Sequence, residues 1–270
     1  MSTSSKDAKA AVILAAGKGT RMKTELPKVA ALLAGQPLLG HVMDNLLAAG
    51  FRRLIFIVGY KQEVVRELVE SHMNGLDDQT IAAATQIEFA EQTEQLGTGH
   101  AFLQAEQALQ NYSGPILAAS GDQPMISAQT FGALLKTHTS GGHGVTVLTA
   151  KMPEPFGYGR IVREGADSSA GQIERIVEEK DATDEQRKID AVYTGTYVYQ
   201  GPAIFSVLHR VGSNNAQNEY YLPDALELNR ADGQTNGSFR LDDQTEAQGV
   251  NSPVELKLLE EKLKLAKSAD

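Results

Sequence analysis

The sequence predicts an α/β fold with a Rossmann-like mixed, mostly parallel sheet flanked by helices. Short apolar runs such as Leu54–Val58 and Pro115–Ala119 alternate with helix-like segments of roughly 10–15 residues, a pattern typical of βαβ units. The runs are uninterrupted, as expected of strands buried on both faces. Such sheets bind ligands at the carboxyl ends of their strands, so we expect the chemistry in the loops after Leu14, Ala90 and Ala119.

The first half of the chain predicts four strands and three helices. The strands are expected at Ala11–Leu14, Leu54–Val58, Ile87–Ala90 and Pro115–Ala119, and the helices at Pro37–Ala49, Val64–His72 and Gly99–Leu109. Gly50 is expected to end the first of these helices, because glycine is favoured just past a helix C-terminus.

The second half is richer in strands, which we expect to extend or flank the sheet as a ligand-facing lobe. The strands are expected at Gly144–Ala150, Gly159–Arg163, Ile173–Glu178, Val192–Tyr199 and, weakly, Phe239–Leu241, with a helix at Glu219–Asn229.

The last segment predicts a capped amphipathic helix. Ser252 is expected to cap it, Pro253 suits the first helical position, and Glu255 completes a capping box. The apolar face is expected to comprise Leu256, Leu259 and Leu263, widened by Leu258 and Leu265.

Composition narrows the classes of function. The 270 residues carry a net charge of −9, which argues against nucleic-acid binding and favours a small phosphorylated ligand held at a local site with a metal ion. The absence of cysteine excludes disulfides and thiolate chemistry. No apolar run approaches the ~20 residues of a membrane span, and residues 1–9 form a polar stretch. We therefore expect a loose N-terminal tail, no membrane segment and a cytoplasmic protein.

The strongest motif is a glycine-rich loop that directly follows the first expected strand. Its residues are Leu14-Ala15-Ala16-Gly17-Lys18-Gly19-Thr20-Arg21-Met22, followed by Leu26-Pro27-Lys28. Backbone N–H groups of such a loop can turn toward an anion, and Arg21 and Lys28 add two cations. The spacing matches neither a Walker A loop nor the dinucleotide-binding glycine pattern. On spacing alone, a plain turn with two surface cations remains an open alternative.

This motif resembles the sugar-nucleotidyltransferase family and, more narrowly, the bacterial N-acetylglucosamine-1-phosphate uridyltransferases. Further matching segments follow in order: Gln92–Ala101, Gly121–Pro124, Phe156–Ile161, Val177–Gln186, Asn214–Gln217 with Glu219–Tyr221, and Gly249–Asn251. The resemblance implies a nucleotide-diphospho-sugar transferase type of fold. Its nucleotide-binding part would span about 10–143 and its sugar-binding part about 144–251, within one domain of 10–251 that precedes the helix of 252–270.

The resemblance implies Mg²⁺-dependent transfer of the uridylyl group of UTP to a sugar 1-phosphate, foremost N-acetylglucosamine 1-phosphate, with release of pyrophosphate. Arg21, Lys28 and Asp122 would be catalytic, the two cations holding the UTP phosphates. Asp122 and Asn251 would coordinate Mg²⁺, which takes few protein oxygens beside phosphates and water. Without the resemblance, Asp122 is equally well a turn former and Asn251 a loop residue.

The remaining implied contacts divide between the two substrates. Nucleotide contacts are implied for Leu14, Ala15, Ala16, Gly17, Gly19, Thr20, Lys28, Gln92, Gly97, Thr98 and Gly121. Gln92 and Gly97 would face uracil, because an amide both donates and accepts and a glycine allows close approach. Sugar contacts are implied for Gly159, Glu178, Tyr193 and Thr194. From the residues alone, Gln92 and Gly97 are loop residues and Glu178 is a solvated strand end.

Two departures from the family pattern leave the sugar open. This chain has Ser120 where the family usually has tyrosine before Gly-Asp, and Tyr193 where it usually has asparagine before Thr-Gly. Replacing an amide beside the sugar by a phenol can change selectivity strongly. Two alternatives therefore stay open: the same fold with another sugar 1-phosphate or nucleoside triphosphate, and a non-catalytic nucleotide-sugar-binding protein.

The family's second half, a left-handed β-helix acetyltransferase, has no counterpart in this sequence. We therefore expect no acetyl-CoA chemistry. A homo-oligomer is compatible with the sequence but is not implied by it.

Overall fold

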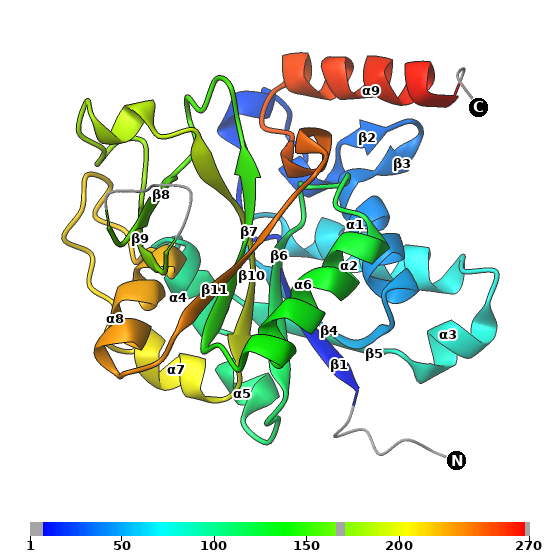
Figure 1. Ribbon diagram of the computed structural model, residues 1–270. Coiled ribbons are helices and arrows are strands. Elements are labelled where there is room, and N and C mark those ends of the chain that lie inside the picture. Colours follow the sequence, from blue (N-terminus) through cyan, green and yellow to red (C-terminus); the bar gives the residue numbers. More distant parts are fainter. Residues whose placement is uncertain (1–7, 166–170, 268–270) are drawn as a thin grey trace.

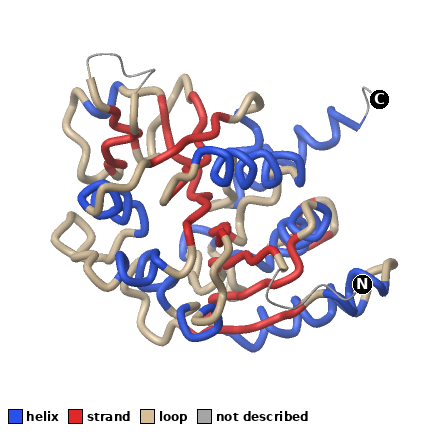
Figure 2. Tube along the Cα trace, turned by 60° about the horizontal axis from the view of Figure 1, so that its bottom comes forward, coloured by secondary structure: helices blue, strands red, loops and turns tan. Residues whose placement is uncertain are grey.

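The computed structural model describes residues 8–165 and 171–267, in which one nine-stranded sheet carries helices on both sides (Figures 1 and 2). The strand order is β11-β7-β10-β6-β1-β4-β5, with β8 paired to β10 and β9 to β8. The strands are β1 (Lys9–Leu14), β4 (Phe51–Val58), β5 (Gln86–Glu91), β6 (Pro115–Ser120), β7 (Val145–Lys151), β8 (Arg160–Arg163), β9 (Ile173–Val177), β10 (Ala191–Gln200) and β11 (Asn236–Arg240). The expected tail, residues 1–9, lies outside the described residues up to position 7, and Lys9 already belongs to β1.

The helices and a small hairpin complete the described structure. The hairpin is β2 (Leu32–Leu33) with β3 (Gln36–Pro37), and the α-helices are α1 (Leu38–Ala48), α2 (Gln62–Asn74), α3 (Gln79–Ala84), α4 (Thr98–Leu103), α5 (Glu106–Leu109), α6 (Ala128–Gly141), α7 (Ala203–Leu208), α8 (Ala225–Ala231) and α9 (Pro253–Lys267). None of the helices in the described part of the chain is long and apolar enough for a membrane span.

The strand directions gather many loops at one edge of the sheet. β5, β4, β1 and β6 run parallel, so that Leu14 at the end of β1 pairs with both Ile57 and Ser120. β10 runs antiparallel to β6, with Tyr197 opposite Ala118, which places the start of β10 beside the end of β6. β7 is antiparallel to β10 and parallel to β11, so both end at that same edge. The strands predicted in the second half therefore extend the sheet, and β8 and β9 flank it.

The core lies on both faces of the sheet, as the apolar runs predict. Along β1, Ala10 and Val12 contribute to one buried apolar cluster, and Ala11 and Ile13 contribute to another. Successive side chains of a strand point to opposite faces, so a strand covered by helices on both sides must be apolar throughout. Because the strands are packed on both faces, their ends are held in place, and so are the starts of the loops that follow them.

One predicted helix is divided in the structure, and α6 was not predicted. The helix expected at Gly99–Leu109 is divided into α4 and α5 by a turn at Gln104 and Ala105. α6 carried no prediction, although Ser127 caps it by accepting a hydrogen bond from the N–H of Thr130.

The helix expected at Glu219–Asn229 is wrong at its start. The N–H of Tyr220 donates to the carbonyl of Leu96 (2.8 Å), and the carbonyl of Tyr220 accepts from the N–H of Gly99 (2.8 Å). These long-range bonds hold the backbone extended, so α8 begins only after a 3₁₀ turn at Leu222–Asp224. Gly97 lies against the same segment at φ +110°, where an added Cβ would come 2.6 Å from the Tyr220 carbonyl oxygen.

α9 packs mainly on the first half of the chain. Leu259 is buried, and Leu256 and Leu263 pack against the same apolar cluster, formed with Met22, Leu33, Leu38 and Val250. Leu258, expected to widen this apolar face, is 54% exposed and lies outside the cluster. The Leu265 side chain and residues 268–270 lie outside the described residues.

The cap of α9 also differs from a capping box. Ser252 Oγ accepts from the N–H of Glu255 (3.3 Å), as expected. The Glu255 carboxylate instead accepts from the N–H of Asn251 (2.5 Å), one residue before the expected donor. The first turn of α9 is thereby joined to a predicted site residue.

Candidate active site

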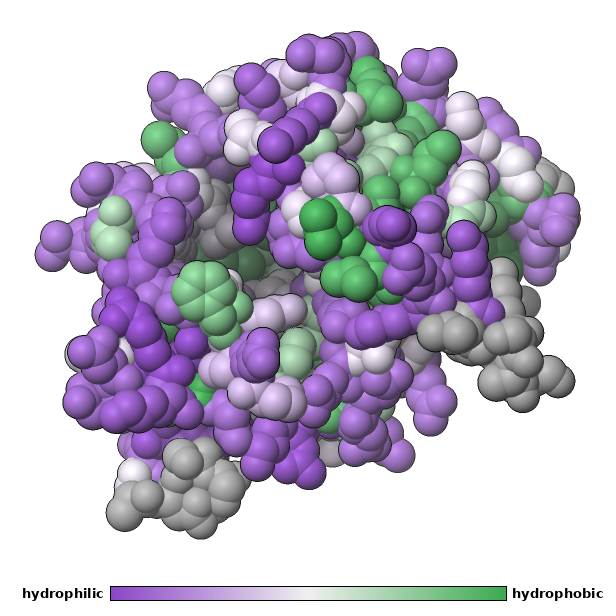
Figure 3. Space-filling view, turned by 90° about the horizontal axis from the view of Figure 1, so that it is seen from above, coloured by the Kyte–Doolittle hydropathy of each residue, from purple (hydrophilic) through white to green (hydrophobic). Residues whose placement is uncertain are grey.

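A cavity of about 590 Å³ opens at the carboxyl edge of the sheet. Figure 3 shows this face hollowed near its centre, with mostly hydrophilic side chains and a few apolar groups around it. The walls come from the ends of β1 and β6, the start of β10, the loop after β7, and α9. The sequence-predicted site residues that line it are Leu14, Arg21, Thr98, Asp122, Gly159, Glu178, Tyr193, Thr194 and Asn251.

The glycine-rich loop presents unused donors. Among the described residues, none accepts a hydrogen bond from the backbone N–H of Ala16, Gly17, Lys18 or Gly19. Only a single 3₁₀ turn, Thr20–Met22, directly follows, so an anion bound here would depend on the loop's own N–H groups rather than on a helix dipole. Glycine is required at position 19, at φ +64°, where an added Cβ would lie 2.5 Å from the Cβ of Lys28.

Lys28, Asp122 and Asn251 meet at one point. The Lys28 ammonium donates to the Asp122 carboxylate and, at 3.0 Å, to Asn251 Oδ1. Asp122 lies just past β6. The hydroxyl of Ser120 donates to the other carboxylate oxygen of Asp122, and the backbone carbonyl of Asp122 accepts from the N–H of Val250 (3.0 Å). The serine that departs from the family pattern therefore helps to hold the Asp122 carboxylate.

This geometry suits a magnesium ion. Two oxygens, one from Asp122 and one from Asn251, converge on a single cation, which here is the Lys28 ammonium. Mg²⁺ prefers oxygen ligands and usually takes one or two from protein beside substrate phosphates. No cluster of three or more His, Asp or Glu side chains suited to a metal occurs within the described residues, so an all-protein metal cage is not an alternative there.

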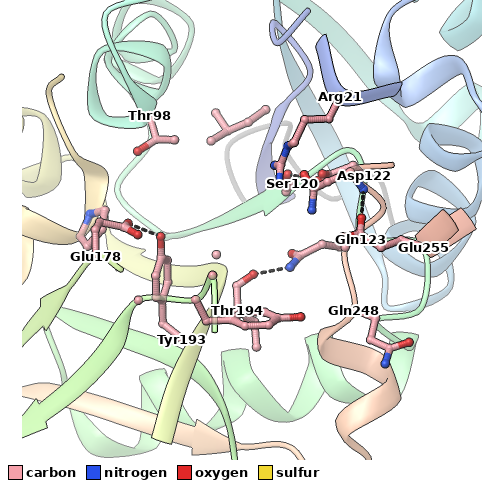
Figure 4. A pocket seen from close by; sticks show the side chains of 18 of the residues that line it. Arg21, Thr98, Ser120, Asp122, Gln123, Glu178, Tyr193, Thr194, Gln248 and Glu255 are labelled. Carbon is pink, nitrogen blue, oxygen red and sulfur yellow. Dashed lines mark hydrogen bonds between the residues drawn. The ribbon is translucent and has the colours of Figure 1, made fainter. Parts of the chain in front are cut away.

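Arg21 brings a cation to the cavity wall. Figure 4 shows its side chain reaching toward the end of β6, where Ser120 and Asp122 lie. No described residue forms an ion pair with Arg21, so its charge is available to a ligand. A guanidinium offers a planar fork of donors that matches phosphate oxygens.

The residues expected around uracil adjoin the glycine-rich loop rather than the cavity wall. Gln92 is buried, and its amide N–H₂ donates to the carbonyl of Gly97 (3.1 Å). The side chain of Gln95 donates to the carbonyl of Ala16 (2.9 Å), which joins the loop after β5 to the glycine-rich loop. The predicted contacts absent from the cavity wall are Ala15, Ala16, Gly17, Gly19, Thr20, Lys28, Gln92, Gly97 and Gly121.

The opposite wall is aromatic and acidic. The Tyr193 hydroxyl donates to the Glu178 carboxylate (Figure 4), and the Tyr193 ring packs so closely on Gly159 that an added Cβ there would lie 2.3 Å from it. Burial raises the pKa of Glu178, an effect that the hydrogen bond from Tyr193 partly offsets. Burial, followed by the charge of Glu178, raises the pKa of Tyr193 well above its usual value. Thr194 uses its hydroxyl inside the sheet, donating to the Leu148 carbonyl (3.1 Å).

An ion pair with one buried partner holds the loop beside this wall. Arg160, whose side chain is 2% exposed, donates to Glu179 Oε2 (2.7 Å) and to the carbonyl of Tyr158. Glu179 Oε2 also accepts from the N–H of Gly157 (3.1 Å). The two adjacent carboxylates therefore have different roles: Glu178 lines the cavity, whereas Glu179 stabilises the loop that borders it.

Sequence reasoning missed several residues of the wall. They include Gln123, Tyr197, Gln248, Glu255, Leu258 and Lys262. Helical spacing could have grouped Glu255, Leu258 and Lys262 on one face of the last helix. Nothing local in the sequence indicates that this face turns toward the cavity.

Comparison with protein families identifies the class of protein as a nucleotidyl transferase. The nucleotidyl transferase family profile matches residues 10–245, and the chain belongs to that family. The bifunctional protein GlmU of Syntrophotalea carbinolica is 45% identical over 251 residues, covering 93% of this chain and 50% of that protein. The GlmU of Streptococcus gordonii is 41% identical over 246 residues, covering 91% and 50%. The chain thus spans about half the length of these relatives.

Solved structures agree on the fold. The crystal structure of UDP-glucose pyrophosphorylase complexed with UDP-glucose aligns with a TM-score of 0.74 over 96% of this chain and 99% of that one. Its sequence identity is 18%, so the likeness bears on the fold alone. The predicted mixed, mostly parallel sheet with flanking helices and a C-terminal helix is confirmed.

Proposed function

We propose that this protein transfers the uridylyl group of UTP to a sugar 1-phosphate, foremost N-acetylglucosamine 1-phosphate, in a Mg²⁺-dependent reaction that releases pyrophosphate. One observation carries the proposal: free loop N–H groups, Arg21, and the cation site of Asp122 and Asn251 lie at one sheet edge. Across the cavity lies Glu178, an acceptor for sugar hydroxyls. The 41–45% identity to GlmU proteins supports the uridylyl donor and this acceptor.

The chemistry requires positioning more than proton transfer. A phosphate oxygen of the sugar 1-phosphate forms a bond to the α-phosphorus of UTP, and the bond from that phosphorus to the bridging oxygen of pyrophosphate breaks. The attacking oxygen is already anionic, so no general base is needed. The loop N–H groups and Arg21 would bind the triphosphate and neutralise charge as pyrophosphate leaves.

Lys28 would take part from its place beside Asp122. Its ammonium lies at the cation site while its Cβ lies against Gly19, so the side chain extends from the glycine-rich loop to that site. A magnesium ion bound by Asp122 and Asn251 would supply Lewis-acid stabilisation of phosphate charge. In its presence, Lys28 would be free to bind a phosphate oxygen.

The test is a pyrophosphate-release assay with the full chain. UTP is paired with N-acetylglucosamine 1-phosphate, glucose 1-phosphate and other hexose 1-phosphates, with Mg²⁺ or EDTA, and CTP, GTP and dTTP replace UTP in parallel. We expect release that needs UTP, a sugar 1-phosphate and the metal. Binding of UTP or UDP-sugar by calorimetry without any release would instead indicate a non-catalytic binding protein.

A further inference from the structure

α9 forms a wall of the cavity through one of its faces. Glu255, Leu258, Leu259 and Lys262 all line the cavity, and their spacing of three or four residues places them on one side of a helix. Leu259 is 2% exposed within the apolar cluster beneath α9, and the Glu255 carboxylate bonds the N–H of Asn251. The helix is therefore anchored at both its apolar face and its first turn.

Lys262 brings an unpaired positive charge to this wall. Its ammonium donates to Gln248 Oε1 at 3.1 Å, a neutral partner, and it forms no ion pair with any described residue. Gln248 precedes Gly249, where an added Cβ would lie 3.7 Å from Asp122 Oδ2. Lys262 is thus tied to the chain segment that runs past the cation site.

Lys262 is one of few positive charges in a cavity whose described lining carries more acidic than basic side chains. Among the described residues that line it, Arg21 and Lys262 are cationic, whereas Asp122, Glu178 and Glu255 are acidic. The whole chain has a net charge of −9, so an anionic ligand depends on cations placed locally. Lys257 on the same helix is 78% exposed and pairs with Glu261 (4.0 Å), whereas Lys262, also exposed, has no acidic partner among the described side chains.

We propose that Lys262 binds a phosphoryl group of the substrates or of the pyrophosphate product, which makes α9 part of the active site. The inference rests on the proposed function for the identity of these ligands. A lysine acts on phosphate as a point charge without demanding a fixed angle. The hydrogen bond to the neutral amide of Gln248 would be exchanged for one to an anionic phosphate oxygen, in which both partners are charged.

The experiment compares Lys262→Ala with the matched variant Lys257→Ala, which removes the same charge from the outer side of the same helix. KM is measured for UTP and for the sugar 1-phosphate, and Kd for inorganic pyrophosphate with Mg²⁺ by calorimetry. We expect Lys262→Ala to weaken at least one of these by roughly 5- to 20-fold, with Lys257→Ala within twofold of wild type. Lys262→Arg should restore most of the loss. Equal melting temperatures for all variants exclude a folding effect.

The arms separate the sources of the phosphate. Weakened UTP and pyrophosphate binding places Lys262 on the nucleotide side, whereas a changed KM for the sugar 1-phosphate alone places it on the acceptor side. If all three constants stay within twofold, or if Lys257→Ala has the same effect, the inference is overturned. If the wild type binds pyrophosphate or UTP without turnover, the proposed function fails while the binding arm still decides on Lys262. A wild type that binds none of these anions overturns both.

Discussion

Lys28 and Asp122, 94 residues apart in the sequence, form an ion pair at the carboxyl edge of the sheet. The same ammonium bonds Asn251 Oδ1, so it occupies the point at which two oxygens would bind a divalent ion. A cation entering this site must displace Lys28. Metal binding at this site would therefore be coupled to movement of Lys28, because the ion and the ammonium cannot occupy the same point.

This coupling predicts a gain of metal affinity in one variant. Lys28→Met keeps the length of the side chain and removes its charge. We expect the nucleotide-free variant to bind Mn²⁺ at least about tenfold more tightly than wild type, because no ammonium competes. The measurement is free Mn²⁺ by electron paramagnetic resonance during a titration. Lys23→Met, an exposed cation near the same loop, serves as the control. Unchanged or weaker Mn²⁺ binding in Lys28→Met would show that Lys28 does not compete for the site.

Asp122 should be required for turnover and dispensable for folding. We expect Asp122→Ala to lower kcat by more than about 100-fold at saturating Mg²⁺, which corresponds to ~2.7 kcal/mol of barrier. The melting temperature should stay within a few degrees, because Lys28 is partly exposed and can turn to water. Asp122→Asn keeps the shape and separates charge from packing. A variant that retains more than about a tenth of wild-type kcat would contradict the metal role.

Tyr193 should govern the choice of sugar. Its ring covers Gly159 and its hydroxyl occupies the Glu178 carboxylate, so both the shape and the acceptor of that wall depend on it. We expect Tyr193→Asn to shift the ratio of kcat/KM between N-acetylglucosamine 1-phosphate and glucose 1-phosphate by at least about fivefold, with KM for UTP unchanged. Tyr193→Phe, which keeps the ring, separates the hydroxyl from the bulk. A ratio that neither variant changes would remove Tyr193 from the sugar site.

Asp224 should make stability depend on pH. Burial, followed by the charges of Glu227, Glu178 and Asp181, raises the pKa of Asp224 to about 6 in the folded chain. Because the pKa of Asp224 is higher in the folded chain than in the unfolded chain, where it is near 4, the protonated carboxyl stabilises the folded state. This stabilisation is complete below the unfolded pKa and is lost as the pH rises through about 6.

Asp224→Asn removes that ionisation. We expect the variant to be more stable than wild type at pH 8 by on the order of 1 kcal/mol, or roughly 2–4 °C, after allowance for solvent screening. Near pH 4.5 the two proteins should melt within a degree of each other. Thermal melts across pH 4.5–8 measure this, and a stabilisation that is equal at both ends would argue against a titrating Asp224.

The sequence predicts the parallel core well because its evidence is local. Apolar runs such as Leu54–Val58 and the glycine that ends α1 each follow from short-range rules. The start of the helix at Glu219 failed because Tyr220 is held by Leu96, more than a hundred positions earlier. Pattern and propensity cannot weigh a bond that only the folded chain creates.

The candidate site likewise has a part that the sequence predicts and a part that it does not. The family resemblance selected Asp122, Asn251 and Glu178, and the fold places them around one cavity. The occupation of the cation site by Lys28 and the place of Lys262 on the wall depend on how distant segments pack. The sequence alone carries no signal for either.

The proposed function requires the glycine-rich loop and the Asp122–Asn251 site to bind one triphosphate together. The most direct measurement is a crystal structure of the full chain with Mg²⁺ and a UTP analogue that has a non-cleavable α,β bridge. We expect phosphate oxygens on the N–H groups of residues 16–19 and near Arg21, with the ion on Asp122 and Asn251 and Lys28 displaced. A triphosphate bound elsewhere, or an ion distant from Asp122, would contradict it.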